Sequence, residues 1–263
     1  MHEADSYDYN CFITLTYSPE HLPKYGSLVK RDFQLFIKRL REWISDAPDL
    51  FLKSNHSNLR YYMCGEYGES SGRPHYHAIL FNLQFVDRKY LKDCNGIPLY
   101  TSDTLSRIWG KGLVSIGSVT FDSAAYVARY ILKKAHGEQA LLKYQIADYF
   151  SGVIPEDSQG RPLTLVPEYT TMSRRPGIGK AFYDKYCQII YRDDSVYFKD
   201  SPLPPPRYYD RLYELDHPSH FVSLRRQRVR KAIKYSVDNT RDRLSVKLEL
   251  LKMRIKKLIR PLD

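Results

Sequence analysis

The apolar residues in the first half of the chain switch repeatedly between two periods, and the order of the switches restricts the fold. Strand-like runs, rich in aromatic and β-branched residues, lie at 10–18, 59–66, 75–83 and 113–119. Helical spacing of apolar residues is found at 28–44 and 123–134. The order strand, helix, strand, strand, strand, helix is typical of an α+β fold. We therefore expect a central antiparallel β-sheet with helices packed on one face.

A loop rich in glycine and serine separates two of the predicted strands. It lies between the runs at 59–66 and 75–83 and contains Gly68, Ser71 and Gly72. A short loop of this kind between two strands predicts a β-hairpin.

Positive charge is concentrated near the C-terminal end of the chain. The 263 residues include 41 Lys and Arg and 30 Asp and Glu, for a net charge of +11 at pH 7. Residues 221–263 contain 14 of the basic and 4 of the acidic residues, so this segment carries +10 and the rest of the chain +1. A basic excess favours a polyanionic partner, and nucleic acid is the first candidate.

A proline cluster precedes the basic segment. The sequence DSPLPPPRYYD at 200–210 cannot continue a helix or a central strand, and it predicts a stiff connector. We therefore expect a folded domain at 1–200, a connector at 201–220 and a basic amphipathic helical tail at 221–263. Within the domain, the stretch 135–200 shows no clear pattern.

Composition also excludes several classes of protein. No apolar run approaches the roughly 18 residues of a membrane span, and the N-terminal sequence lacks the pattern of a signal peptide. The four cysteines form no CxxC pair, which argues against a zinc knuckle or a disulfide framework. We expect a soluble protein of a reducing cytoplasm, with no membrane partner.

Two histidines suggest a metal site. His75 and His77 are one residue apart on a predicted strand, so the period of two places both imidazoles on the same face. Histidine is the commonest metal ligand, and a third ligand is expected to be a carboxylate from a neighbouring strand. Glu66 is the first candidate and Glu69 the second. The alternative is a pair of histidines at the surface or core edge that bind nothing.

Two tyrosines and a lysine share one face of the helix predicted at 123–134. Tyr126, Tyr130 and Lys134 are four residues apart in turn. A tyrosine can attack phosphorus and hold a covalent intermediate, although forming its phenolate at pH 7 costs about 4 kcal/mol. A nearby cation can offset part of that cost. The alternative is that these are packing residues, since the chain has 23 tyrosines.

In combination these segments resemble a known superfamily. FITLTY at 12–17, GRPHYHAILF at 72–81 and AAYVARYILKK at 124–134 resemble the three ordered motifs of the HUH rolling-circle replication initiators. The helix with two tyrosines is similar to that of the A-protein initiators of small isometric single-stranded DNA phages.

Two further segments resemble a narrower group within that superfamily. PEYTTMSRRPGIG at 167–179 and PLPPPRYYD at 202–210 resemble the replication-associated proteins of gokushoviruses, in the Microviridae. The resemblance covers about residues 1–210. Related phage initiators often carry a basic, cysteine-containing segment ahead of the region that matches MHEA, and its absence here is a departure from that pattern.

The resemblance implies a nickase that acts on a single-stranded DNA origin in the cytoplasm of a bacterial host. A tyrosine attacks the scissile phosphate and keeps the 5′ end as a phosphotyrosine ester. The released 3′ hydroxyl serves the host replication machinery (helicase and polymerase), and the ends are later rejoined.

The resemblance also implies residue roles, position by position. Lys134 has the weakest match, because Lys133 competes with it. The implied metal ligands are His75, His77 and Glu66, and the implied catalytic residues are Tyr126, Tyr130 and Lys134. Two imidazoles and a carboxylate leave positions open for phosphate oxygens, and either Mg²⁺ or Mn²⁺ suits this set.

Two other functions compete with the nickase. A two-histidine, one-carboxylate iron oxygenase would use a distant histidine from the set His21, His56, His136, His217 and His220. A non-catalytic single-stranded DNA-binding protein would use the basic tail and exposed aromatic residues. A covalent protein–DNA adduct distinguishes the nickase from the binding protein.

The basic tail has its own alternatives. Apolar residues from Ile233 to Leu258 trace a stripe of nearly helical spacing, with basic residues on the other faces. We expect a DNA-holding arm, and the alternatives are an amphipathic helix packed on the body and a short self-associating coil. The residues expected to contact DNA are Arg225, Arg226, Arg228, Arg230 and Lys231.

Overall fold

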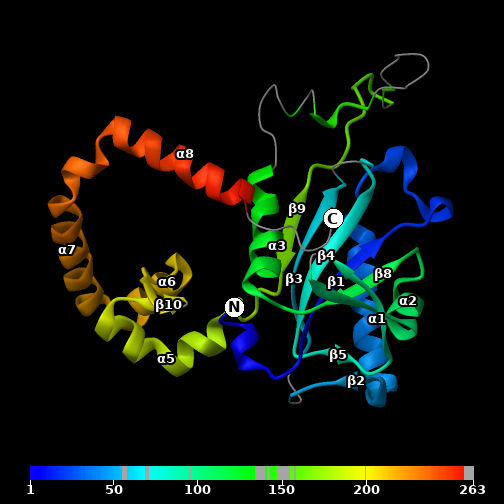
Figure 1. Ribbon diagram of the computed structural model, residues 1–263, viewed down its shortest axis with the longest axis horizontal. Coiled ribbons are helices and arrows are strands. Elements are labelled where there is room, and N and C mark those ends of the chain that lie inside the picture. The colour runs from blue at the N-terminus through cyan, green and yellow to red at the C-terminus, as the bar shows by residue number, and fades with distance from the viewer. Residues whose placement is uncertain are drawn as a thin grey trace. The chain divides into compact units, whose positions relative to one another are not determined.

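Two compact units make up the chain. The computed structural model describes residues 1–54, 58–68, 71–94, 96–133, 140, 143–146, 155–156, 158–198 and 200–257. The sheet unit comprises Met1 and Glu3–Ile178, and the helical unit comprises Gly179–Ile259 with His2 (Figure 1). The division at Ile178 lies earlier than the boundary expected at 200.

An antiparallel sheet of seven strands forms the sheet unit. In spatial order the strands are β6 (Arg88–Cys94), β7 (Ile97–Ser102), β8 (Val114–Gly117), β1 (Asn10–Thr16), β4 (Pro74–Phe81), β3 (Arg60–Tyr67) and β9 (Tyr169–Met172). The predicted α+β class and the predicted hairpin are confirmed, because β3 and β4 pair in an antiparallel register with Tyr67 opposite Pro74. The hairpin β6–β7 was not predicted.

Helices cover both faces of this sheet, so the prediction of helices on one face is wrong. Alternate residues of β1 and β4 are apolar on both sides, which gives each face a surface to bury. Helices α1 (Lys30–Asp46) and α2 (Asp103–Trp109) pack on the face that contains Ile13 and Ala78. Helix α3 (Phe121–Lys133) packs on the opposite face, which contains Phe12 and Ile79 (Figure 1).

The first of these faces holds the larger core. In α1, Phe33, Phe36, Ile37 and Leu40 are buried at the spacing of one helical face. The smaller elements of the sheet unit are the pair β2 (Phe51–Leu52) and β5 (Gln84–Phe85) and the 3-10 helices η1 (Ala4–Ser6), η2 (Pro19–His21), η3 (Lys24–Gly26) and η4 (Pro48–Leu50).

The helical unit has a core made largely of tyrosines. Its elements are α5 (Lys180–Asp193), β10 (Val196–Phe198), β11 (Ser201–Leu203), α6 (Arg207–Asp216), α7 (Pro218–Lys234), η5 (Ser236–Asn239) and α8 (Arg241–Lys257). Tyr183, Tyr191, Tyr209 and Tyr213 are buried there, and Tyr191 stacks on Tyr213 with ring centroids 3.7 Å apart.

Two expected boundaries therefore differ from the structure. Residues 201–220 contain β11, α6 and the start of α7 rather than a connector alone, because the prolines end just before α6 and the helix begins at Arg207. The segment 221–263 is not a separate arm at its start, since Phe221 and Leu224 of α7 are buried in the tyrosine core.

The apolar stripe predicted beyond α7 lies on the surface. Val237 is 84% exposed, and Leu244, Leu248 and Leu251 of α8 are about half exposed. The structure therefore gives no support to a helix that packs this stripe on the body, as far as the described residues show. Within the same residues, no helix combines the length and the apolar character needed to cross a membrane.

Candidate metal and tyrosine site

Strand register brings the predicted ligands together. On the face covered by α3, Glu66 of β3 lies directly opposite His75 of β4, and His77 lies opposite Cys64 on one side and Thr14 of β1 on the other. The period of two then places Glu66, His75 and His77 side by side. The prediction that the two imidazoles share a face is confirmed by this arrangement.

The three side chains converge on one carboxylate oxygen. Glu66 Oε1 lies 2.8 Å from His75 Nε2 and 2.8 Å from His77 Nε2. Glu66 and His77 are almost fully buried, and the side chain of His75 is 12% exposed. Two imidazole nitrogens and a carboxylate oxygen in contact are a donor set that can hold a divalent metal ion.

Neighbouring groups orient both imidazoles. His75 Nδ1 donates to the carbonyl oxygen of Arg73 at 3.0 Å, so in the neutral ring the Nε2 lone pair is directed toward Glu66. His77 Nδ1 is 2.9 Å from the hydroxyl of Thr14, which directs its Nε2 toward the same carboxylate. Such outer contacts are the usual companions of histidine ligands in metal sites.

The carboxylate stays ionised over the physiological pH range. Burial alone would raise the pKa of Glu66, but the contacts with His75 and His77 outweigh it and lower the pKa to about 2. A permanently charged oxygen suits a metal ligand. It also makes Glu66 a poor proton acceptor for a phenol, whose usual pKa is about 10.

Tyr126 of α3 reaches the same cluster. Its hydroxyl donates to Glu66 Oε1 at 3.0 Å, and its ring meets that of His77 edge-on with centroids 5.0 Å apart. The side chain is only 2% exposed and packs with Phe12 and Val127. The structure thus brings one predicted nucleophile to the predicted metal ligands.

Three other predicted residues cannot be placed. Tyr130 belongs to α3, but its side chain is outside the described part of the structure. Lys134 and Glu69 lie outside the described residues altogether.

The other histidines do not join this group. His21 contacts Ser18, and His217 and His220 lie beside Tyr213 in the helical unit. His56 and His136 are outside the described residues. Among the residues that the structure describes, Glu66, His75 and His77 form the one cluster with the geometry of a metal site.

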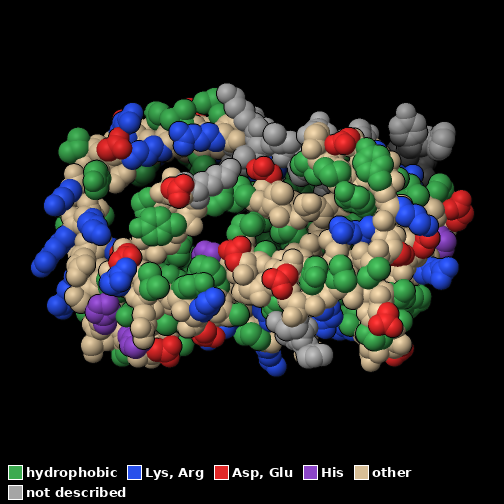
Figure 2. Space-filling view, turned by 60° about the horizontal axis from the view of Figure 1, so that its bottom comes forward, with side chains coloured by type: hydrophobic (Ala, Val, Ile, Leu, Met, Phe, Trp, Pro, Cys, Tyr) green, Lys and Arg blue, Asp and Glu red, His purple; other side chains and the backbone are tan. Residues whose placement is uncertain are grey.

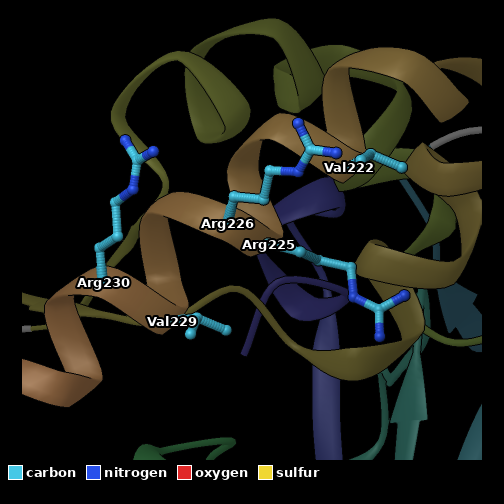
Figure 3. A pocket seen from close by; sticks show the side chains of 5 residues that line it. All are labelled: Val222, Arg225, Arg226, Val229 and Arg230. Atoms are coloured by element: carbon cyan, nitrogen blue, oxygen red, sulfur yellow. The ribbon is translucent and has the colours of Figure 1, made fainter.

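The basic residues predicted to contact DNA fall into two groups. Arg226, Arg230 and Lys231 of α7 are exposed, and Arg225 is exposed beside Glu214 at 3.8 Å. Arg225, Arg226 and Arg230 line a hollow of about 390 Å³ with Val222 and Val229, and their guanidinium groups extend away from the helix in different directions (Figure 3). Figure 2 shows Lys and Arg side chains gathered over α7, at the left of the view.

Arg228 forms the second group and has a structural role. Its guanidinium donates to Asp194 and Asp210, with contacts of 2.7 to 3.1 Å among them. These hydrogen bonds raise its pKa above the usual range. Its charge is balanced inside the helical unit, so we leave it out of any DNA interface.

Sequence analysis missed two residues near the site. Thr14, which contacts His77, lies within the strand FITLTY, but only the pairing of β1 with β4 shows its role. Arg129 of α3 lies over the ring of Tyr126, with its guanidinium carbon 5.8 Å from the ring centroid. Its position three residues after Tyr126 on a helix is the signal that was available.

Comparisons with known proteins agree with this site. The family model for replication-associated protein ORF2 matches residues 10–135, a range that includes Glu66, His75, His77 and Tyr126. No solved structure matches the chain.

Three phage proteins are similar in sequence. Replication-associated protein VP4 of Bdellovibrio phage phiMH2K is 38% identical over 84% of this chain and 63% of its own length. Replication-associated protein ORF2 of Spiroplasma virus 4 is 33% identical over 97% of this chain and 76% of its own length. Replication-associated protein ORF4 of Chlamydia phage 1 is 30% identical over 50% of this chain and 32% of its own length.

The chain therefore spans 63% of the first relative and most of the second. The match to the second relative extends past the sheet unit and includes the helical unit. With the cluster of Glu66, His75 and His77 inside the region that the family model matches, these similarities confirm the resemblance to gokushovirus proteins, and the chain belongs to the family of phage replication-associated proteins.

Proposed function

We propose that this protein initiates replication of a single-stranded phage genome by nicking the viral origin. Tyr126 or Tyr130 attacks a phosphodiester, a bond forms between phosphorus and the phenolic oxygen, and the bond from phosphorus to the 3′ oxygen breaks. The 3′ oxygen leaves with a proton as a free hydroxyl that the host helicase and polymerase use. The reverse reaction rejoins the ends.

One observation carries the proposal. The hydroxyl of Tyr126 and the Nε2 atoms of His75 and His77 meet at a single oxygen of Glu66, so a nucleophile and a metal-ligand set occupy one buried site. Packing residues alone would not require a hydroxyl, a carboxylate and two imidazoles at the same point of an apolar layer.

The chemistry of the site follows from these contacts. A bound Mg²⁺ or Mn²⁺ would polarise the scissile phosphate and stabilise its developing charge. The hydrogen bond to Glu66 holds the phenol of Tyr126 at the cluster, and the Arg129 guanidinium over its ring favours the phenolate electrostatically. Because forming the phenolate costs about 4 kcal/mol at pH 7, we expect both effects to contribute.

The direct test is to find the covalent adduct. Single-stranded oligonucleotides tiled across the phage genome and labelled at the 3′ end are incubated with the protein and Mn²⁺. The label should become attached to protein through Tyr126 or Tyr130, as mapped by peptide mass spectrometry. The Tyr126→Phe, Tyr130→Phe double variant should form no adduct. Tyr90→Phe is the matched control, since Tyr90 is an exposed tyrosine of β6.

Contrary results are equally clear. An adduct on another tyrosine would refute the assignment of the nucleophiles. DNA binding without any adduct would favour the non-catalytic single-stranded DNA-binding protein.

The exposed arginines of α7 are proposed to hold the DNA. Replacing Arg225, Arg226 and Arg230 with alanine should reduce the slope of log affinity against log salt by about 2, at roughly 0.7 for each phosphate on a single strand. Nicking of a short saturating oligonucleotide should persist. Deleting 221–263 is a poorer test, because Phe221 and Leu224 belong to the tyrosine core.

A further inference from the structure

A second basic surface lies on the sheet unit, away from the metal ligands. A groove of about 520 Å³ is formed where β3 begins, between the C-terminal part of α1 and the segment that follows β9. It is lined by Arg41, Asn58, Leu59, Arg60, Tyr61, Met172, Ser173, Arg174 and Arg175. Four of these are arginines, and no acidic residue is among them.

The charges of the groove are of two kinds. The guanidinium of Arg60 is used by the fold, because it contacts Glu3 at 2.5 Å and donates to the carbonyl oxygens of Pro176 and Gly177. Arg41, Arg174 and Arg175 are exposed, and none of them forms an ion pair with a described residue. Three positive charges therefore face solvent in one groove.

The backbone beneath these charges is held firmly. Ser173 N donates to the carbonyl oxygen of Tyr61, and Tyr61 N donates to the hydroxyl of Ser173. With the two hydrogen bonds from Arg60 to the next turn, four contacts tie the segment containing Arg174 and Arg175 to β3. Such a segment presents its arginines with little ordering cost on binding.

The groove also offers surface for bases. Met172 is 36% exposed, Tyr61 is half-buried against Phe33, and the amide of Asn58 can both donate and accept hydrogen bonds. Basic side chains beside aromatic and apolar ones are the usual composition of a groove for single-stranded nucleic acid.

The position of the groove relates it to the proposed reaction. Arg60 and Glu66 are six residues apart on the same strand, which corresponds to about 20 Å. A single strand whose scissile phosphate lies at Glu66, His75 and His77 can reach this distance with several nucleotides.

We propose that Arg41, Arg174 and Arg175 bind the phosphate backbone of single-stranded DNA several nucleotides from the scissile phosphate. This subsite rests on the proposed nicking function for its relation to the origin, but its DNA contact can be measured separately. It is distinct from the basic face of α7, because every residue that lines it belongs to the sheet unit.

The experiment measures binding without cleavage. Fluorescence anisotropy with a labelled single-stranded oligonucleotide is recorded in EDTA over a range of salt concentrations. The Arg41→Ala, Arg174→Ala, Arg175→Ala triple variant should lower the salt slope by about 2 and weaken binding about 100-fold at 0.1 M salt relative to 1 M salt. Arg60 is left unchanged because its contacts are structural.

Two variants make the result specific. The Arg88→Ala, Lys89→Ala, Lys92→Ala variant removes the same charge from β6, the strand at the opposite edge of the sheet, and should retain the wild-type slope. Lysine at positions 41, 174 and 175 should restore the slope. An unchanged slope in the alanine variant, or an equal loss in the β6 variant, would overturn the proposal. Because EDTA prevents metal-dependent cleavage, failure of the nicking proposal would leave this measurement unaffected.

Discussion

The sheet unit and the helical unit use their polar residues in opposite ways. In the sheet unit, a carboxylate, two imidazoles and a phenol are buried together at one end of a sheet face. In the helical unit, the buried hydroxyls belong to a tyrosine core, where Arg228 joins Asp194 and Asp210. Burial and a hydrogen bond to Asp210 raise the pKa of Tyr191 above its usual range.

This difference shows where chemistry and charge can each be placed. Reactive groups in the sheet unit are positioned by cross-strand register, which fixes neighbouring side chains to within a few ångströms. Most of the net charge lies in 221–263, on helices whose exposed faces need no such precision. Long-range attraction to DNA depends on total charge, whereas nicking depends on geometry.

The largest expected effect is on the metal ligands. The His75→Ala, His77→Ala double variant should lose cleavage and Mn²⁺ binding, because two of the three ligands disappear. The loss should exceed the roughly 10- to 100-fold typical of outer contacts. Isothermal titration with Mn²⁺ and a cleavage assay measure the two effects, and EDTA treatment of the wild-type protein should reproduce the second. Undiminished nicking by the double variant would exclude a metal role.

Next in size is a test of whether the units are independent. Phe221→Ala should destabilise the helical unit by about 3–5 kcal/mol, because a buried ring leaves the tyrosine core. Nicking of a short saturating oligonucleotide should persist. Urea denaturation followed by circular dichroism measures stability.

The matched variant in the sheet unit is Leu80→Ala, which removes a fully buried side chain of β4. It should cost about 2–5 kcal/mol and should also impair cleavage, since β4 carries His75 and His77. If Phe221→Ala abolished cleavage as well, the two units would depend on each other.

A smaller effect is expected from the outer contact to His77. Thr14→Val keeps the shape of the side chain but removes the hydroxyl 2.9 Å from Nδ1. We expect Mn²⁺ affinity to fall about 10- to 100-fold, with Thr14→Ser close to wild type. Equal affinity of the valine and wild-type proteins in the Mn²⁺ titration would show that the hydroxyl does not orient the ring.

The smallest effect is expected on α8. Leu248→Ser and Leu251→Ser should each change stability by less than about 0.5 kcal/mol, because both side chains are about half exposed. Thermal denaturation measures this. A loss of several kcal/mol would mean that the apolar stripe is covered, as in a helix packed on another surface or a self-associating coil.

Local pattern predicted much of the sheet unit. The strands near 10–18, 59–66, 75–83 and 113–119 and the helices near 28–44 and 123–134 are present with shifts of a few residues at their ends. The hairpin β6–β7 was missed although its sequence contains Asn95-Gly96, a strong turn signal. In the stretch 135–200, β9 has only four residues, too few for a period to be recognised.

The sequence alone determined that His75 and His77 share a face, because alternation along a strand is a local property. It also located the basic excess and the helix that carries Tyr126. Only the tertiary structure decided that Glu66 lies opposite His75, that Thr14 contacts His77 and that α3 packs on the face away from α1.

The same holds for the basic residues. Arg225 and Arg228 look alike in the sequence, yet one is exposed and the other joins two carboxylates. Arg41 and Arg174 are 133 positions apart and line one groove. Strand register, sheet face and ion pairing all depend on contacts between residues far apart in the chain, and the period of a single segment carries no information about them.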